Sequence, residues 1–287
     1  MGERLRVTDS QIEKDTKIDS LKEGKNIQKK GSWRGILKRN EERWLALAGL
    51  LVFLLIWELA PALGIIKPIF TSSPSRIVQA ADWLFKHGLW YDIWVSLVEF
   101  CLGFGLAIMV AIPLGVILGW YRRVNAIFEP FVTALNAMPR VALLPLIILW
   151  LGLGIYSKVA VVFLGAVFPI LINTTVGVRT VDLNLVKCAR SFGAGDSQLL
   201  RTLALPTSVP FMLAGMRLGI GRGLVGVVVG ELVAANAGLG HMMSRAGATF
   251  QTDKVFVGII LLTGFGYILT EILKKIEKRV ETWRPVI

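Results

Sequence analysis

The sequence is poor in cysteine, histidine and acidic residues. Its 287 residues include two cysteines and two histidines, and 32 Lys and Arg outnumber 20 Asp and Glu, which gives a formal net charge of +12. Cys101 in an apolar segment and Cys188 in a polar one provide neither a disulfide framework nor the spacing of a metal site. The sequence also lacks the Gly-x4-Gly-Lys-Ser/Thr phosphate loop, which excludes the usual way of binding a nucleotide.

The apolar content is high: 54% of the residues are hydrophobic and the mean hydropathy is +0.62. A soluble domain of this size carries fewer apolar residues and more charge. Segments such as Leu45–Trp57 and Leu106–Leu118 contain no charged residue. In hydrocarbon a helix satisfies its backbone groups within one segment, whereas a β-barrel would require short alternating segments, which this sequence lacks. The sequence therefore predicts an all-α polytopic membrane protein.

Six apolar segments predict six transmembrane helices within a membrane domain over residues 43–287. The preceding residues 1–42 are polar and mixed in charge, which favours a flexible basic tail, although a regulatory or docking arm is an alternative. Glycines four residues apart, as at Gly115 and Gly119, predict close packing of helices in lipid. The expected spans are residues 44–63, 92–120, 131–153, 158–178, 206–235 and 255–273.

The distribution of Lys and Arg predicts how the spans are oriented, because cytoplasmic loops carry an excess of basic residues. With the N-terminus inside, 23 of the 32 basic residues fall in cytoplasmic segments and six fall outside or at outer span ends. Both termini are therefore expected in the cytoplasm. Residues 179–205 form the largest loop between spans on that side.

This loop has the pattern of a helix, a glycine turn and a second helix. Asp182 or Asn184 can cap the first helix, and Gly193 or Gly195 can end it with a left-handed residue. Asp196 or Ser197 can begin the second helix, which Pro206 is expected to stop or kink. Its apolar positions, Leu185, Phe192, Leu199 and Leu203, favour a loop that docks onto another protein.

The loop resembles the motif Glu-Ala-Ala-x-x-x-Gly-x9-Ile-x-Leu-Pro of importer permeases of the ATP-binding-cassette (ABC) type. Lys187 replaces the usual acid, which puts in doubt the salt bridge that this acid makes with the ATPase. Cys188 replaces an alanine and Leu203 an isoleucine. The resemblance implies that the loop couples ATP hydrolysis to transport through Lys187, Cys188, Ala189, Gly193, Leu203, Leu205 and Pro206.

Further motifs are similar to the nitrate, sulfonate, taurine and bicarbonate branch of these permeases, among them residues 71–75, 143–154, 168–173 and 238–240. The resemblance extends from about Pro68 to Trp283. It implies a type I ABC importer permease with a cytoplasmic coupling helix, in a prokaryotic inner membrane. The implied partners are a second permease copy, two ATPase subunits that bind ATP and Mg, and an external solute-binding protein. No cofactor, metal or catalytic residue is expected in this chain.

Charged residues inside spans are costly and are candidates for function. Arg140 can attract an anionic solute or extend to the headgroups, and Glu99 is expected to pair with an arginine. Arg222 and Glu231 lie nine residues apart, too far for a direct pair on one helix. The candidate substrate path comprises Asn136, Arg140, Asn173, Arg217, Arg222 and Glu231, with structural pairing as the alternative.

Two other classes of function remain as alternatives. An ion-gradient-driven secondary carrier would also place polar groups near the membrane midplane. An intramembrane hydrolase is suggested by His241 near Ser244, but the Gly-x-Ser-x-Gly elbow is missing from the sequence. Recovery of an ATPase partner would separate the importer from both.

Overall fold

The computed structural model describes residues 44–281, so the predicted flexible tail over residues 1–42 lies outside the described residues. Every regular element within the described range is a helix, which confirms the all-α class. The chain divides into two units, residues 1–66 and 67–287, and each is described by itself. The predicted boundary between tail and membrane domain stays a prediction.

The described part of the first unit is a helix over Trp44–Ala62, which is long and apolar enough to cross a membrane. The predicted first span, residues 44–63, agrees with it. The helix ends in a turn through Gly64, whose φ of 72° lies in the left-handed region that glycine favours. The amides of Leu63 and Ile65 bond back to the carbonyls of Leu59 and Ala60.

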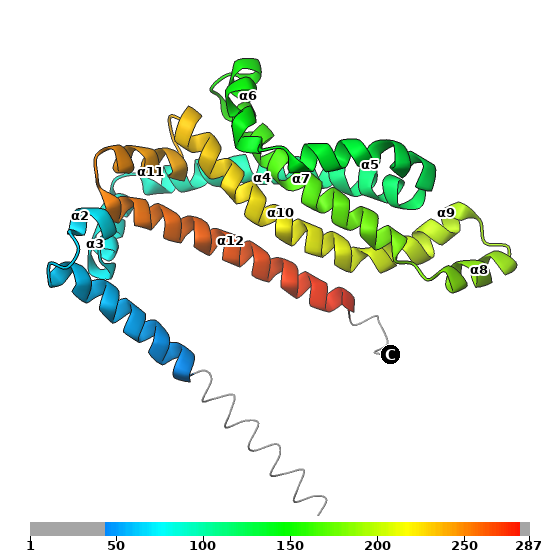
Figure 1. Cartoon of the computed structure of the whole chain (residues 1–287), viewed down its shortest axis with the longest axis horizontal. Coiled ribbons are helices and arrows are strands. Elements are labelled where there is room, and N and C mark those ends of the chain that lie inside the picture. Colours follow the sequence, from blue (N-terminus) through cyan, green and yellow to red (C-terminus); the bar gives the residue numbers. More distant parts are fainter. Residues whose placement is uncertain (1–43, 282–287) are drawn as a thin grey trace, which may run out of the picture. The chain divides into compact units, whose positions relative to one another are not determined.

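Four long helices of the second unit, α4, α7, α10 and α12, run side by side (Figure 1). The helices α8 and α9 lie at one end of this bundle, and α3 and α11 lie at the other. The helices of this unit are α2 (Pro68–Thr71), α3 (Pro74–Lys86), α4 (Leu89–Trp120), α5 (Arg122–Ala137), η1 (Arg140–Leu143), α6 (Leu144–Leu151), α7 (Ile155–Arg179), α8 (Leu183–Ser191), α9 (Asp196–Leu199), η2 (Leu200–Ala204), α10 (Leu205–Ala234), α11 (Leu239–Ala248) and α12 (Thr252–Glu281).

The core lies along α7, which packs against both α4 and α10. Small residues allow the backbones to approach closely. A Cβ atom added at Gly115 of α4 would lie 2.7 Å from the Cβ of Thr174, and one at Gly215 of α10 would lie 2.8 Å from that of Asn173. These separations are shorter than real Cβ contacts, so only glycine fits at either crossing. The predicted packing role of the spaced glycines is confirmed.

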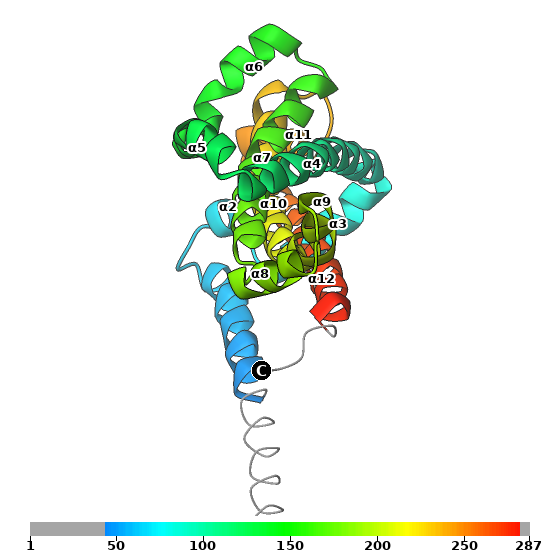
Figure 2. The same ribbon diagram turned by 90° about the vertical axis from the view of Figure 1, so that its right-hand side faces the viewer.

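The third predicted span is wrong as a single helix. Helix α5 and the following segment Arg140–Leu151 meet at an angle of 86°, and α6 stands away from the long helices in both views (Figure 2). The break falls at Met138 and Pro139, because the residue before a proline disfavours the helical region and Met138 is extended, with ψ 134°. Among the described residues five helices can span a membrane, and a sixth span results if this bent pair counts as one.

The loop after α7 folds as a helix, a turn and a second helix, as predicted. The side chain of Asp182 accepts a hydrogen bond from the amide of Asn184 at 2.8 Å, so Asp182 caps α8. Gly193 makes the turn with a φ of 84°. The second helix continues through the π-helix η2 into α10, so Pro206 lies within a continuous helical segment. A proline conflicts with the preceding helical turn, and the π-helix lies where that conflict would occur.

Candidate functional site

Three predicted path residues meet at the break between α5 and α6. Arg140 of η1 donates to the side-chain oxygen of Asn136 at 3.0 Å, and Arg222 of α10 donates to the same oxygen at 3.1 Å. The guanidinium of Arg140 also lies over the ring of Phe168, 5.6 Å from its centroid. We call Asn136, Arg140 and Arg222 the arginine cluster. Two cations from separate helices thus converge on one neutral amide.

A cavity of about 340 Å³ opens beside the arginine cluster. Arg140 and Arg222 line it, and its other lining residues are methionine, valine and glycine. No acidic side chain lines it. The Nε atom of Arg140 is buried and has no hydrogen-bond partner within residues 44–281. The cavity therefore offers an apolar wall and positive charge, which together suit a small anion.

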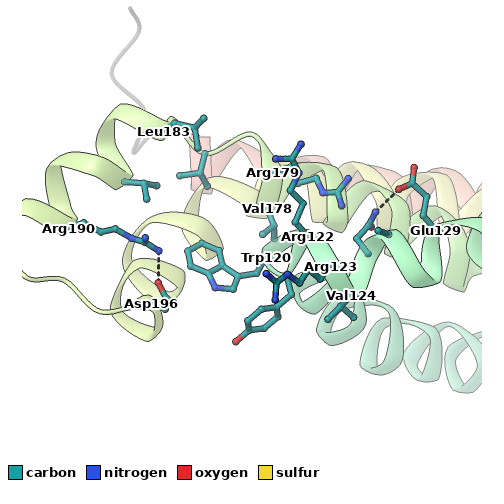
Figure 3. A pocket seen from close by; sticks show the side chains of 16 residues that line it. Trp120, Arg122, Arg123, Val124, Glu129, Val178, Arg179, Leu183, Arg190 and Asp196 are labelled. Carbon is teal, nitrogen blue, oxygen red and sulfur yellow. Dashed lines mark hydrogen bonds and ion pairs between the residues drawn. The ribbon is translucent and has the colours of Figure 1, made fainter.

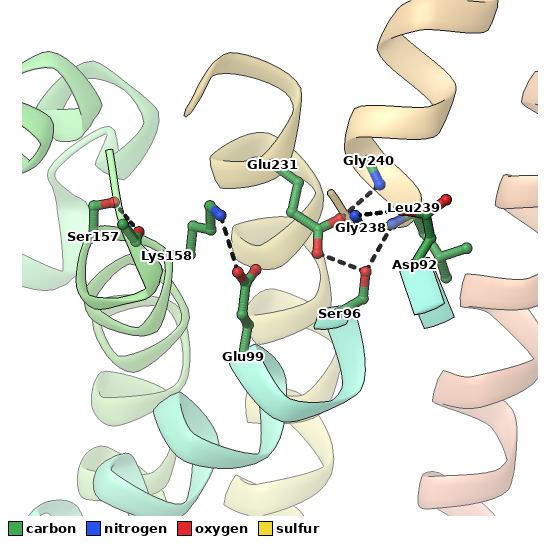
Figure 4. Close-up of polar contacts among 10 residues, drawn as sticks. Asp92, Ser96, Glu99, Ser157, Lys158, Glu231, Gly238, Leu239 and Gly240 are labelled. Atoms are coloured by element: carbon green, nitrogen blue, oxygen red, sulfur yellow. Dashed lines mark hydrogen bonds and ion pairs between the residues drawn. The ribbon is translucent and has the colours of Figure 1, made fainter. Parts of the chain in front are cut away.

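A second polar group lies in the core and carries the opposite balance of charge. Glu99 of α4 pairs with Lys158 of α7 at 3.0 Å, and the two side chains are 2% and 8% exposed. The prediction of an arginine partner for Glu99 is wrong: the partner is Lys158. Lys158 is the first residue of an apolar segment, so it was predicted to lie at the outer end of a span. Its long side chain instead reaches inward to the carboxylate (Figure 4).

Glu231 of α10 holds the beginning of α11. Its carboxylate accepts hydrogen bonds from Ser96 at 2.5 Å and from the amide of Gly240 at 2.6 Å. The hydroxyl of Ser96 accepts in turn from the amide of Leu239 at 2.8 Å. The first amides of a helix lack partners within it, and side chains from two spans supply those partners here. The side chain of Asp92 accepts from the amide of Gly238 at 2.8 Å. We call Asp92, Ser96, Glu99, Lys158 and Glu231 the acidic network (Figure 4).

The remaining two path candidates lie apart from the arginine cluster. Arg217 forms an ion pair with Glu277, which ties α10 to α12. Asn173 donates to the carbonyl of Pro169 on its own helix at 2.8 Å. The structure therefore brings together three of the six predicted residues, Asn136, Arg140 and Arg222. Sequence reasoning missed Ser96, Lys158 and Glu277, because each finds its partner on another helix.

The turn between α8 and α9 presents apolar side chains outward. Phe192 is 87% exposed, and Leu183 and Leu185 of α8 are also exposed. Leu199, in contrast, is 1% exposed and packs inside the chain, so the expectation that it belongs to a docking surface is wrong. An ion pair of 2.7 Å between Arg190 and Asp196 closes the turn. The predicted coupling residues Lys187, Cys188, Gly193 and Pro206 are exposed, and Ala189, Leu203 and Leu205 are half-buried.

The comparison with protein families decides the class of protein. The family described as the binding-protein-dependent transport system inner membrane component matches residues 111–282. The chain belongs to this family. Its predicted resemblance to ABC importer permeases is thereby confirmed. As a family member, the chain is a multi-pass inner-membrane transport component rather than an enzyme, and the comparisons lend no support to the secondary carrier or the hydrolase.

Named relatives lie in the predicted branch. The chain is 30% identical to the taurine transport system permease protein TauC of Escherichia coli, over 88% of this chain and 93% of TauC. It is 32% identical to the putative aliphatic sulfonates transport permease protein SsuC of Bacillus subtilis, over 86% and 91% of the two chains. A chain of the inward-facing MetNI methionine ABC transporter has the same fold, with a TM-score of 0.57 and 20% identity over 69% of this chain and 96% of that chain.

Proposed function

We propose that this family member is the translocation subunit of an ATP-driven importer for a small anionic solute of the nitrate, sulfonate, taurine or bicarbonate type. It would act with a second copy of itself, two ABC ATPase subunits and an extracytoplasmic solute-binding protein. Sulfonates are favoured, because the names of TauC and SsuC refer to taurine and aliphatic sulfonates.

The observation that carries the proposal is the arginine cluster beside its cavity. Arg140 and Arg222 face a space of about 340 Å³ that no acidic side chain lines. Two guanidinium groups share one amide oxygen, so most of their donors remain available. Guanidinium groups bind sulfonate- and phosphate-like oxygens through parallel hydrogen bonds. An anion that enters would offset the charge repulsion between the two arginines.

The loop over residues 179–205 is proposed to contact the ATPase. Three exposed apolar side chains, Leu183, Leu185 and Phe192, provide the anchor that a protein interface requires. Because α9 continues into α10, a displacement of the loop would be transmitted along a single helical segment into the membrane. ATP and Mg would bind to the partner, and ATP-driven closure would then shift the permease between inward-open and outward-open states.

The orientation proposed from the basic residues places α8 and both termini in the cytoplasm. Lys187 is exposed at the position where the resembling motif has an acid. If an acid on the ATPase compensates, Lys187→Glu should weaken the complex. Equal retention of the ATPase by both forms would show that this position is electrostatically neutral.

Purification in mild detergent with candidate ATPase and binding-protein partners tests the function. We expect co-purification of an ATPase and ATP-dependent uptake of a sulfonate in proteoliposomes. In Arg222→Gln, uptake should fall about tenfold or more, since a charged hydrogen bond to the solute is lost, while Arg222→Lys retains part of it. Uptake by the chain alone without ATP would overturn the proposal.

The coupling role has its own test at the glycine turn. Gly193→Pro is expected to abolish the turn, because a φ of 84° is closed to proline, and Pro206→Ala should relax the start of α10. Both variants should uncouple ATP hydrolysis from uptake while the membrane bundle stays folded. Normal uptake and normal solute-stimulated ATPase activity in Gly193→Pro would contradict a coupling role.

A further inference from the structure

A second and larger cavity lies where α4, α5 and α7 meet the loop that carries α8. Its volume is about 1070 Å³. It is lined by Trp120 and Tyr121 at the end of α4, by Arg122 and Arg123 of α5, and by Arg179 at the end of α7. Figure 3 shows these arginines between the Arg190–Asp196 pair on one side and Glu129 on the other. None of these residues belongs to the arginine cluster or to the predicted coupling motif.

The charges in this cavity do not balance. Asp196 pairs with Arg190 at 2.7 Å, and Glu129 accepts from the side-chain Nδ2 of Asn125 at 2.6 Å. Within residues 44–281, no ion pair is formed by Arg122, Arg123 or Arg179. Arg179 makes one long hydrogen bond of 3.4 Å to the carbonyl of Leu118. The charge of Glu129 offsets at most one of these three cations, which leaves about two positive charges without a counterion.

The three arginines are exposed, so water screens part of their mutual repulsion, and an anion in the cavity would relieve the remainder. Like charges repel, and the repulsion is stronger beside protein and lipid than in bulk water. Arg122 and Arg123 also occupy the first turn of α5, which has no acidic residue. The helix dipole disfavours cations at that end. A ligand that brings negative charge and several acceptor oxygens would remove both costs.

The position of the cavity indicates the source of that charge. Helices α4 and α7 both qualify as membrane spans, Leu89–Trp120 and Ile155–Arg179, and the cavity begins where both end. Tryptophan and tyrosine at the end of a span are suited to the headgroup level of a bilayer. Basic pockets between transmembrane helices on the cytoplasmic side suit anionic lipid headgroups. A ligand in this cavity would therefore lie at the headgroup level of the bilayer, next to membrane lipids.

We propose that this cavity binds the phosphate-bearing headgroup of an anionic phospholipid in the cytoplasmic leaflet. The choice of leaflet rests on the proposed orientation, and the link to the coupling loop rests on the proposed importer function. Arg122 and Arg179 would bind the phosphate from two different helices. Since α8 forms another wall of the cavity, the headgroup joins the ends of the spans to the loop that is proposed to meet the ATPase.

The experiment uses the full chain, purified in detergent with and without the ATPase, and delipidated. Native mass spectrometry then measures how many phosphatidylglycerol molecules bind to each chain. Phosphatidylcholine, which has no net charge, is the control lipid. We expect one tightly bound phosphatidylglycerol per chain. Its affinity should fall about 10- to 30-fold in the double variant Arg122→Gln/Arg179→Gln, since each basic residue near the surface contributes on the scale of a fewfold to tenfold change.

The matched control is Lys275→Gln/Lys278→Gln, which removes the same charge from exposed positions near the end of α12. It should leave phosphatidylglycerol binding unchanged. Equal losses in both double variants would overturn the site, and so would equal binding of phosphatidylcholine. Displacement by millimolar inorganic phosphate would assign the cavity to a free anion, and displacement on adding the ATPase would assign it to that subunit. Either result overturns the proposal.

Lipid binding is measured without ATP or solute, so its outcome is independent of the proposed transport function. Absence of phosphatidylglycerol binding by the wild-type chain, together with intact ATP-driven uptake, would remove only this proposal. Failure to recover an ATPase, with lipid binding intact in wild type and lost in the double variant, would remove the importer function and leave the lipid site. Unfolding temperature and dimer content of each variant would show that lost binding does not result from misfolding.

Discussion

The arginine cluster and the acidic network are both groups of polar residues among apolar helices, yet they differ in how completely they are paired. In the acidic network the carboxylate of Glu231 is fully buried and accepts hydrogen bonds from Ser96 and Gly240. In the arginine cluster, Arg222 is exposed and shares one amide oxygen with Arg140. Glu231 has both carboxylate oxygens bonded, although Oε2 of Glu99 has no partner among the described residues. Arg222 retains most of its donors.

The difference bears on which intramembrane charges contact solute. Charged residues in spans are functional candidates by default, and this criterion selected Glu231 and Arg222 alike. The carboxylate of Glu231 is occupied by hydrogen bonds that hold α11 against α4 and α10. Arg222 lines a cavity. A charge within a span therefore marks a residue as a candidate for solute contact. Free hydrogen-bond donors beside a cavity then distinguish Arg222 from Glu231.

The largest effect is expected where the acidic network is broken. Lys158→Met should leave Glu99 buried without its cation and destabilise the chain by about 3–5 kcal/mol, because an unpaired buried charge is strongly unfavourable. Thermal unfolding in detergent measures the change. The double variant Glu99→Gln/Lys158→Met should recover most of the loss. A single variant as stable as wild type would show that the pair is not buried in the membrane.

A smaller effect is expected at Ser96, whose hydroxyl links Glu231 to the amide of Leu239. Ser96→Ala removes both hydrogen bonds within a buried site and should cost about 1–3 kcal/mol. Ser208→Ala is the matched control: Ser208 is also fully buried, but its hydroxyl bonds the carbonyl of Leu205 on its own helix. Equal destabilisation by the two substitutions would contradict a special role for the link to α11.

The arginine cluster should respond in the opposite way. Asn136→Ala removes the oxygen that both arginines share, so their positions loosen while no buried charge loses a salt bridge. We expect a change in unfolding free energy of about 1 kcal/mol or less and a several-fold rise in KM for uptake. Asn173→Ala, which loses only a bond to its own helix, is the comparison. A KM equal to wild type in Asn136→Ala would argue against solute contact at this cluster.

The smallest expected effect is that of ionic strength on the KM for uptake. Exposed charges are screened within about 8–10 Å at physiological ionic strength, whereas buried pairs are screened far less. Raising the ionic strength should therefore increase the KM for an anionic solute by about twofold, and the increase should be smaller in Arg222→Gln. The loss of stability in Lys158→Met should not depend on salt. If the KM for uptake and the loss of stability in Lys158→Met depended on salt in the same way, the distinction between the arginine cluster and the acidic network would be contradicted.

Much of the fold was predictable because its signals are local. Apolar runs predicted five helices that the structure contains. Asp182 or Asn184 predicted the start of α8 and Gly193 or Gly195 its end, and the structure uses Asp182 and Gly193. The bend after α5 was missed even though Pro139 signals it, because hydropathy is continuous across the break. Asn136 and Arg140 are close in sequence, so their contact is local. Their meeting with Arg222, 82 residues beyond Arg140 in sequence, depends on how α10 packs against α7.

The sequence by itself determined that the chain is a bundle of membrane helices of an importer-permease family, with a helix–turn–helix loop after α7. The length of the apolar segments, the spacing of the glycines and the loop motif are local features, so each can be recognised within one segment of the sequence. Only the tertiary structure decided how the charges are shared. Glu99 is matched with Lys158, Glu231 with the start of α11, and Arg140 and Arg222 with a cavity. Such partners lie on different helices, and their pairing is fixed by the close packing of α4, α7 and α10.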